Sequence, residues 1–216
     1  MSKQLTIRHL ALATALSASL LSLTGCNTMA QMGVGPSISE PGTRTTAMRL
    51  TDMNLAQAIR RDIYRDIPAA RDARIEVYAF YQAVLLLGEA QDDAMKERVA
   101  AIARAYPDVR VVHNELTVGP TRALSGRLAD DLLERKAGLS LFSADSLRSS
   151  QALVAAVDGT VYLMGKLTQR ETDRAIVRLQ ALDGVRRIIK IVDILPEPSE
   201  PAATIRPATG QPSVAE

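Results

Sequence analysis

The hydrophobic pattern between Leu50 and Leu195 predicts four helices. Two of them carry an apolar residue at every fourth position, which places these residues on one helix face that we expect to be buried. The first is expected over Asp52–Asp66, with Asp52 as its N-cap, and the second over Thr121–Ala137. Their predicted core residues are Leu55, Ile59 and Ile63 in the first, and Leu124, Leu128 and Leu132 in the second. Two further helix-like stretches span Gln91–Tyr106 and Thr168–Leu182.

Apolar strand-like runs separate these helices and repeat along the chain. The run Ala83–Ala90 contains Gly88, and the run Thr160–Leu167 contains Gly165, 77 residues later. Both glycines are expected to give backbone clearance where a strand meets a helix. Each run is followed by a helix and then by another apolar strand, so the pattern indicates two copies of one structural unit.

Each unit is expected to contain a hairpin and a final strand. Asp158 and Gly159 separate two β-type runs in the second unit, which is a strong two-residue hairpin signal, whereas Phe80-Tyr81 in the first unit is less clear. The last strand, Val185–Ile194, is apolar on both faces, so we expect helices to cover one face and the partner domain or a second chain to cover the other. The predicted fold class is α+β, with the order helix-strand-strand-helix-strand in each unit and a small three-stranded mixed sheet packed on two helices.

The two ends of the chain lack this periodicity. Lys3, Arg8 and His9 precede a short apolar run from Leu10 to Leu23, as in a secretory signal peptide. Residues 26–50 are polar and contain glycine and proline, so we expect a flexible tether. Residues 196–216 contain five prolines and are expected to be a disordered tail.

Leu23-Thr24-Gly25-Cys26 resembles a bacterial lipobox. The resemblance implies cleavage of a 1–25 signal peptide and acylation of Cys26, the only cysteine. A retained transmembrane helix would need about 20 apolar residues, more than this run supplies. Asn27 lies where an aspartate would commonly retain a lipoprotein at the inner membrane, so the resemblance points to the periplasmic face of the outer membrane.

The repeated unit, with a glycine closing its second strand, resembles the BON domain, and His113–Val118 is similar to the usual strand ending of that family. Two such units behind a lipobox resemble the tandem BON-domain outer-membrane lipoproteins. On this resemblance the first domain spans 51–118 and the second 119–195. The family implies non-enzymatic modules that associate with phospholipid and support envelope integrity.

Charge and composition narrow the possible partners. After loss of Lys3 and Arg8 the mature chain carries 24 basic and 24 acidic residues, without the basic excess of a nucleic-acid-binding protein. The charges are nevertheless unevenly distributed: the net charge is −2 over Asp52–Val118 and +3 over Thr121–Leu195, so the second unit carries a basic surplus. With Cys26 acylated, no free thiol remains. The pattern contains no convergent set of metal ligands, nucleophile or phosphate loop, so we expect no catalysis and no cofactor.

Two basic surfaces of the second unit are candidates for contact with anionic lipid. By the family resemblance, the start of helix Thr121–Ala137 is the first candidate, with Arg122, Ala123 and Arg127, although the chain has no tryptophan to serve as an interfacial anchor. The second candidate is a stripe at four-residue spacing, formed by Arg170, Arg174 and Arg178, where each basic residue near an anionic membrane contributes about 1 kcal/mol. A solvated helix face is the alternative interpretation of the stripe.

Two functions fit this sequence. The first is a non-catalytic outer-membrane lipoprotein that supports envelope integrity by binding anionic phospholipid. The alternative is a protein-binding adaptor of an outer-membrane assembly machine, with envelope assembly proteins as partners and no lipid selectivity.

Removal of the thiol at position 26 tests the anchor. We expect Cys26→Ser to yield a protein without acyl chains, measured as the intact mass of the membrane-extracted product. A wild-type protein whose mature form starts elsewhere, or whose mass lacks acyl chains, contradicts the assignment.

Overall fold

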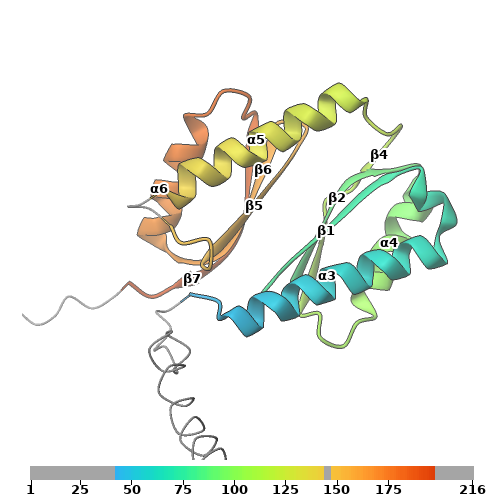
Figure 1. The fold of residues 1–216 in the computed structure, drawn as a ribbon, viewed down its shortest axis with the longest axis horizontal. Helices are drawn as coiled ribbons and strands as arrows, with labels where there is room; N and C mark the ends of the chain where they lie inside the picture. Colours follow the sequence, from blue (N-terminus) through green and yellow to red (C-terminus); the bar gives the residue numbers. More distant parts are fainter. Residues whose placement is uncertain (1–41, 144–146, 198–216) are drawn as a thin grey trace, which may run out of the picture. The chain divides into compact units, whose positions relative to one another are not determined.

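The computed structural model describes residues 42–143 and 147–197 (Figure 1). The predicted signal peptide, Cys26, most of the predicted tether and the tail from residue 198 lie outside the described residues. The elements of the first half are α3 (Thr46–Asp66), η1 (Pro68–Arg71), β1 (Arg74–Phe80), β2 (Ala83–Ala90), α4 (Asp93–Arg104), β3 (Val111–Asn114) and β4 (Thr117–Val118). Those of the second half are α5 (Leu124–Phe142), β5 (Ala152–Val157), β6 (Thr160–Thr168), α6 (Gln169–Gln180) and β7 (Arg187–Leu195).

Both halves have the predicted order and the α+β fold is confirmed. In each half the first two strands form an antiparallel hairpin and the last strand pairs in parallel with the second, which gives the sheet orders β1-β2-β3 and β5-β6-β7. The first sheet has one addition to the predicted three strands, because the two-residue β4 also pairs with β2 beyond the end of β3.

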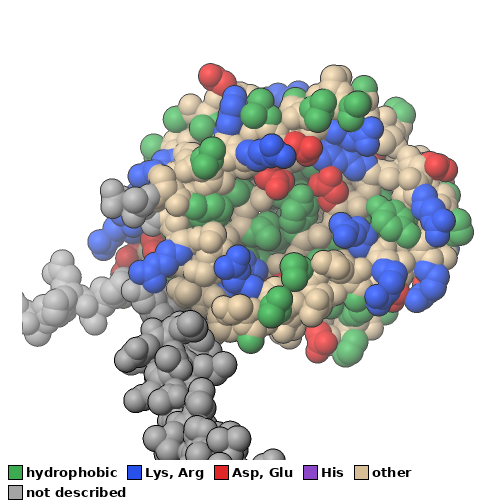
Figure 2. Space-filling view, viewed as in Figure 1, with side chains coloured by type: hydrophobic (Ala, Val, Ile, Leu, Met, Phe, Trp, Pro, Cys, Tyr) green, Lys and Arg blue, Asp and Glu red, His purple; other side chains and the backbone are tan. Residues whose placement is uncertain are grey.

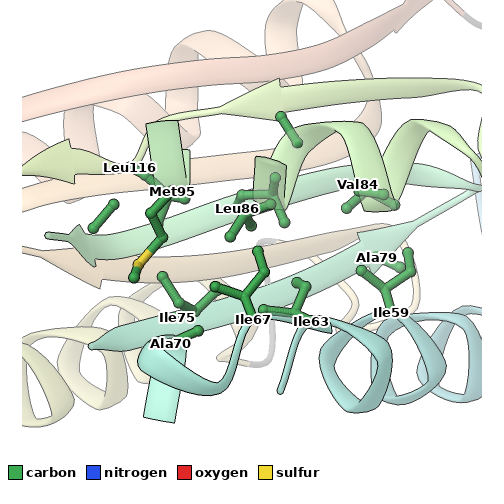
Figure 3. Close-up of a cluster of buried hydrophobic side chains, with 14 of the residues drawn as sticks. Ile59, Ile63, Ile67, Ala70, Ile75, Ala79, Val84, Leu86, Met95 and Leu116 are labelled. Atoms are coloured by element: carbon green, nitrogen blue, oxygen red, sulfur yellow. The ribbon is translucent and has the colours of Figure 1, made fainter. Parts of the chain in front are cut away.

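Each sheet packs one face against its own pair of helices. In the first half Leu55, Ile59 and Ile63 of α3 and Val99 of α4 meet Leu86 of β2 in the core, several of which are labelled in Figure 3. The second half repeats this arrangement with Leu133, Ala137 and Leu141 of α5 and Leu179 of α6. These buried positions lie 78 residues apart in α3 and α5, so the two first helices face their sheets in the same way.

The opposite faces of the two sheets pack against each other. This third cluster joins apolar residues of both halves: Phe80, Ala83, Leu85 and Leu87 from the first, and Ala155, Val157, Tyr162 and Met164 from the second. In β7, Ile188 and Val192 pack on the helix side, while Ile189 and Ile191 pack toward the other half. The prediction that both faces of the last strand are covered is confirmed in part: these four residues are half-buried, Ile194 is exposed, and the cover of the second face is the partner domain.

Both hairpins close through two residues with positive φ. Asp158 and Gly159 have φ of +48° and +67°, as the sequence predicts for a type I′ turn. Tyr81 and Gln82 adopt the same conformation, with φ of +47° and +62°, although neither is a glycine. A non-glycine pair in this region is uncommon and requires support from its surroundings.

A buried aspartate on the first helix of each domain supplies that support. Asp52 accepts hydrogen bonds from the backbone amides of Tyr81 and Gln82, at 3.0 and 3.1 Å. Asp130 accepts one from the amide of Asp158 at 2.9 Å. Asp52 and Asp130 are 3% and 2% exposed, so these bonds are shielded from water.

Each aspartate also pairs with an arginine eight residues before it. Arg44 donates to Asp52 at 2.9 Å, and Arg122 donates to Asp130 at 2.6 Å. Arg44 in addition lies over the ring of Phe80, 3.9 Å from its centroid. The Arg-to-Asp pair is therefore part of the repeat, with the same offset of 78 residues.

The predicted role of Asp52 as N-cap is wrong, and so is the predicted end of the tether. Thr45 caps α3 through a bond from the amide of Met48, so the N-cap lies seven residues before Asp52 and the helix begins at Thr46. The segment before it is held by the backbone bond from Arg44 to Ser150. Residues 42–50 therefore belong to the folded part.

Glycine occupies the two strand positions, 88 and 165, for different structural reasons. Gly88 has φ of +110° and a side chain there would collide with the carbonyl of Arg74, so only glycine fits. At Gly165 a Cβ atom would lie 3.0 Å from the carbonyl oxygen of Gln151, which is tight but not forbidden by the backbone conformation. Both glycines thus lie at close approaches, but the neighbour is the adjacent chain of the hairpin and not a helix, as the sequence had suggested.

Removal of the Asp52 carboxylate tests its importance to the first domain. We expect Asp52→Ala to lower the free energy of unfolding by about 3–5 kcal/mol, because it leaves the buried Arg44 unpaired and two turn amides without an acceptor. Denaturant unfolding of the unacylated chain measures it, with the exposed Asp108→Ala as control. A loss no larger than that of the control contradicts the assignment.

Candidate functional site

The most unusual surface feature of the described chain is a row of leucines on α5. Leu124, Leu128, Leu132 and Leu139 are exposed by 62, 57, 54 and 76%. At 100° per residue they fall within one sector, directly opposite the buried residues Asp130, Leu133, Ala137 and Leu141. Hydrophobic side chains stand beside basic ones along α5 in the upper part of Figure 2.

The sequence-based assignment of these leucines was wrong. Leu124, Leu128 and Leu132 were expected in the core, but the core face of α5 is the one anchored by Asp130. The predicted helix, Thr121–Ala137, also began and ended too early, because α5 spans Leu124–Phe142. A helix with two opposite apolar faces shows four-residue spacing on both, so spacing alone does not identify the buried one.

Basic side chains without acidic partners flank the leucine row. Arg135 and Lys136 are exposed, and neither has an ion pair among the described residues. Arg127 is half-buried, and its Nε atom is buried without a hydrogen-bond partner in the described chain. Ala123, the N-cap of α5, is exposed and makes no side-chain cap. These residues leave positive charge available around an apolar surface.

Arg122, the other predicted lipid ligand of this helix, is already engaged. Its guanidinium group pairs with Asp130 at 2.6 Å and with Asp158 at 3.3 Å. Its counterpart Arg44 has the same role in the first domain, so this arginine position holds the hairpin in both.

Two carboxylates of α5, Asp130 and Glu134, join the second domain to the first. Asp130 also accepts from Arg74 of β1 at 3.0 Å. Glu134 accepts from the hydroxyl of Tyr78 at 3.3 Å and from the amide of Ala156 at 3.3 Å. Burial raises the pKa values of both Tyr78 and Glu134, and the proximity of Glu76 raises both further.

The arginine stripe on α6 is divided by its contacts. Arg178 donates to the carbonyl of Ser140 at 3.0 Å, which satisfies a C-terminal carbonyl of α5. Arg170 lies 3.7 Å from Glu197, which also accepts a bond from the Arg170 amide. Arg174 is exposed and has no ion pair among the described residues. Within the described chain, Arg174 is thus the one arginine of the stripe without a partner.

One buried carboxylate of the first domain stands apart from this pattern. Glu89 of β2 is 3% exposed, and neither of its oxygens accepts a hydrogen bond in the described chain. Burial raises the pKa of Glu89. The nearby backbone amide of Arg122 and the positive charges of Arg74 and Arg122 lower it and partly offset the effect of burial. The fold thus contains a buried carboxyl group whose pKa is raised above that of an ordinary glutamate.

No group of three or more metal-ligating side chains converges in the part of the chain that the structure describes. Among the same residues, no helix has the length and apolar character needed to span a membrane.

Comparison with known proteins shows which proteins the chain resembles. The model of the BON domain matches residues 51–120. The chain is 26% identical to the outer membrane lipoprotein DolP of Haemophilus influenzae, over 80% of this chain and 90% of that protein. It is 23% identical to a 21 kDa hemolysin of Actinobacillus pleuropneumoniae, over 69% of this chain and 77% of that one.

Among solved structures, the C-terminal domain of CdsD, a structural protein of the type III secretion system of Chlamydia trachomatis, matches 63% of this chain and 96% of its own. The identity is 13% and the TM-score 0.28, a likeness too low to inform fold or function.

Residues 51–120 of the chain therefore match the BON domain. Its second half, beyond the residues that the family model matches, repeats the topology of the first. Over 80% of its length the chain is similar to an outer membrane lipoprotein of the DolP type.

Replacement of Glu89 by glutamine tests the buried carboxyl. A group whose pKa is raised in the folded state costs stability as the pH rises from its unfolded pKa, near 4.5, through its folded pKa. We expect Glu89→Gln to unfold like the wild type at pH 4 and to be the more stable of the two at pH 7.5. Urea titrations measure the difference, with the exposed Glu97→Gln as control. A gap that is the same at both pH values contradicts the interpretation.

Proposed function

We propose that the protein is a non-catalytic lipoprotein that is anchored through Cys26 at the periplasmic face of the outer membrane and supports envelope integrity by binding anionic phospholipid. The observation that carries the proposal is the row of four exposed leucines on α5, flanked by Arg127, Arg135 and Lys136. The DolP relative is named as an outer membrane lipoprotein, which supports the location.

The chemistry of α5 suits the surface of a bilayer. Its leucines face away from the core and would enter the boundary between headgroups and acyl chains, as in interfacial amphipathic helices. The unpaired basic groups beside them would meet the phosphates, and each contributes about 1 kcal/mol at an anionic membrane. Because Arg122 is already paired with Asp130, we place the headgroup contacts at Arg127, Arg135 and Lys136.

The arginine stripe of α6 is the weaker candidate. Arg178 supports the end of α5 and Arg170 pairs with Glu197, which leaves Arg174 as its free member. The stripe also has one exposed apolar neighbour, Val177, rather than a row.

Vesicle cosedimentation of the unacylated chain, carrying Cys26→Ser, tests the proposal. We expect binding to vesicles that contain phosphatidylglycerol, weaker binding to phosphatidylcholine, and loss of binding as salt increases. Leu128→Asp together with Leu132→Asp is expected to weaken binding at least tenfold, equivalent to 1.4 kcal/mol. The matched control is Val177→Asp, which changes an equally exposed apolar residue of α6 and should retain binding.

The charge variants separate the two basic surfaces. Arg127→Glu with Lys136→Glu is expected to weaken binding more than Arg174→Glu, whereas Arg122→Glu would disturb the hairpin and is unsuitable. A larger loss from Arg174→Glu contradicts the choice of α5. Absence of binding to either vesicle contradicts lipid recognition and favours the protein-binding adaptor.

A further inference from the structure

A pocket lies on the first domain, between α3 and the edge strands. It has a volume of about 570 Å³, within the usual range of about 300–1,000 Å³ for small-molecule sites. Its apolar lining comes from both domains and includes Leu50, Met53 and Ala56 of α3, Val77 and Ala79 of β1, and Leu153 of β5. In Figure 2 hydrophobic side chains line a hollow at the centre of the face between α3 and α5. We call it the α3 pocket.

Two arginines without partners stand at the α3 pocket. Arg49 and Arg60 both line it, and neither has an ion pair among the described residues. They lie on nearly the same line of α3, about 16 Å apart along the helix axis. The third arginine of the lining, Arg44, is already paired with Asp52. The pocket thus combines an elongated apolar floor with a positive charge at each end.

The internal repeat provides a comparison within the same molecule. Arg127 and Leu128 of α5 occupy the positions of Arg49 and Leu50, and they line a second cavity of about 550 Å³. That cavity contains Asp72, Glu76 and Asp131, and Asp131 stands where α3 has Met53. The cavity beside α5 is therefore lined by carboxylates from both domains, whereas the one carboxylate in the lining of the α3 pocket, Asp52, is paired with Arg44.

An added peptide strand fits the α3 pocket less well. Strand addition needs a continuous row of free backbone groups on an edge strand. The hydroxyl of Tyr64 already binds the carbonyl of Ile75, and Glu134 binds the amide of Ala156, so the edges of β1 and β5 are each occupied at one position near the strand residues that line the pocket, Val77 and Leu153.

We infer that the α3 pocket binds a single anionic phospholipid, with an acyl chain on the apolar floor and the phosphate at Arg49 or Arg60. This goes beyond adsorption of α5 to a bilayer, because the ligand is one lipid molecule held by the other domain. Arg60 also lines the cavity that contains Leu124, Arg127 and Leu128, so variants at Met53 and Leu132, which do not line that cavity, are used to separate the two sites.

Calorimetric titration with a lipid that does not form a bilayer tests the inference. The protein is the unacylated chain with Cys26→Ser, and the ligand is dihexanoyl phosphatidylglycerol below its critical micelle concentration. We expect saturable binding, at least tenfold weaker binding of dihexanoyl phosphatidylcholine, and none of glycerol phosphate. Binding of glycerol phosphate as tight as that of the lipid would contradict an acyl-chain site, and so would absence of lipid binding.

The repeat supplies the variant. Met53→Asp introduces the residue that the fold already has at the equivalent position 131. Because Met53 is also half exposed, we expect the variant to fold. Its unfolding midpoint is measured to verify this. It should weaken lipid binding at least tenfold. Arg49→Gln with Arg60→Gln should remove the preference for phosphatidylglycerol over phosphatidylcholine. Unchanged binding in Met53→Asp, or an unchanged preference in the arginine variant, overturns the assignment.

Leu132→Asp is the matched control. It lies on α5 outside the α3 pocket and should bind the monomeric lipid like the parent chain, even where it reduces vesicle binding. Monomer binding lost in Leu132→Asp and retained in Met53→Asp would place the lipid on α5 and contradict the α3 pocket.

Discussion

A buried carboxylate on the first helix of each domain is the interaction on which the rest of the fold depends. Asp52 binds two amides of a tight β-turn and a guanidinium group at once, and Asp130 binds one turn amide and a guanidinium group. This fixes where the helix lies along its sheet, because the carboxylate must reach the end of the hairpin. It also allows the turn Tyr81-Gln82 to keep positive φ without a glycine. Helix position, hairpin register and turn conformation are thus set by a single side chain.

The second domain extends this interaction across the domain boundary. Asp130 binds Arg74 as well as Arg122, and Glu134 binds Tyr78, so the polar face of α5 next to the strands is occupied by internal contacts. The sheets meet through apolar residues, and these polar bonds lie at the edge of that contact. Side chains that hold the domains together are unavailable to a ligand, which leaves the opposite face of α5 for recognition.

The order of elements could be predicted from the sequence because each carries a local pattern. The 77-residue spacing of Gly88 and Gly165, the hairpin at Asp158-Gly159 and the apolar last strand all describe local geometry or simple burial, and the structure agrees with them. The start of α3 was missed because Thr45 lies in a polar stretch, and Asp52 is also a good N-cap residue type.

The candidate surface was harder to predict, for a physical reason. Leu124, Leu128 and Leu132 have the spacing of a core stripe, and only the alignment of Asp130 with Asp52 shows which face is buried. The repeated arginine-to-aspartate spacing of eight residues was visible in the sequence and would have identified it. Free and engaged arginines cannot be distinguished by spacing, since Arg122 and Arg127 differ only in what the fold places beside them.

The apolar contact between the sheets has a consequence for how such a chain can evolve. Each domain permanently covers the apolar sheet face of the other, through residues that include Leu85, Leu87, Tyr162 and Met164. A gene that kept only one copy would encode a sheet with an uncovered apolar face, and two such products would be complementary to each other. Tandem duplication converts that association into one within a single chain, where partner concentration no longer matters. The two copies are then free to diverge on their outer helices, as Met53 and Asp131 have done, as long as the faces between them stay matched.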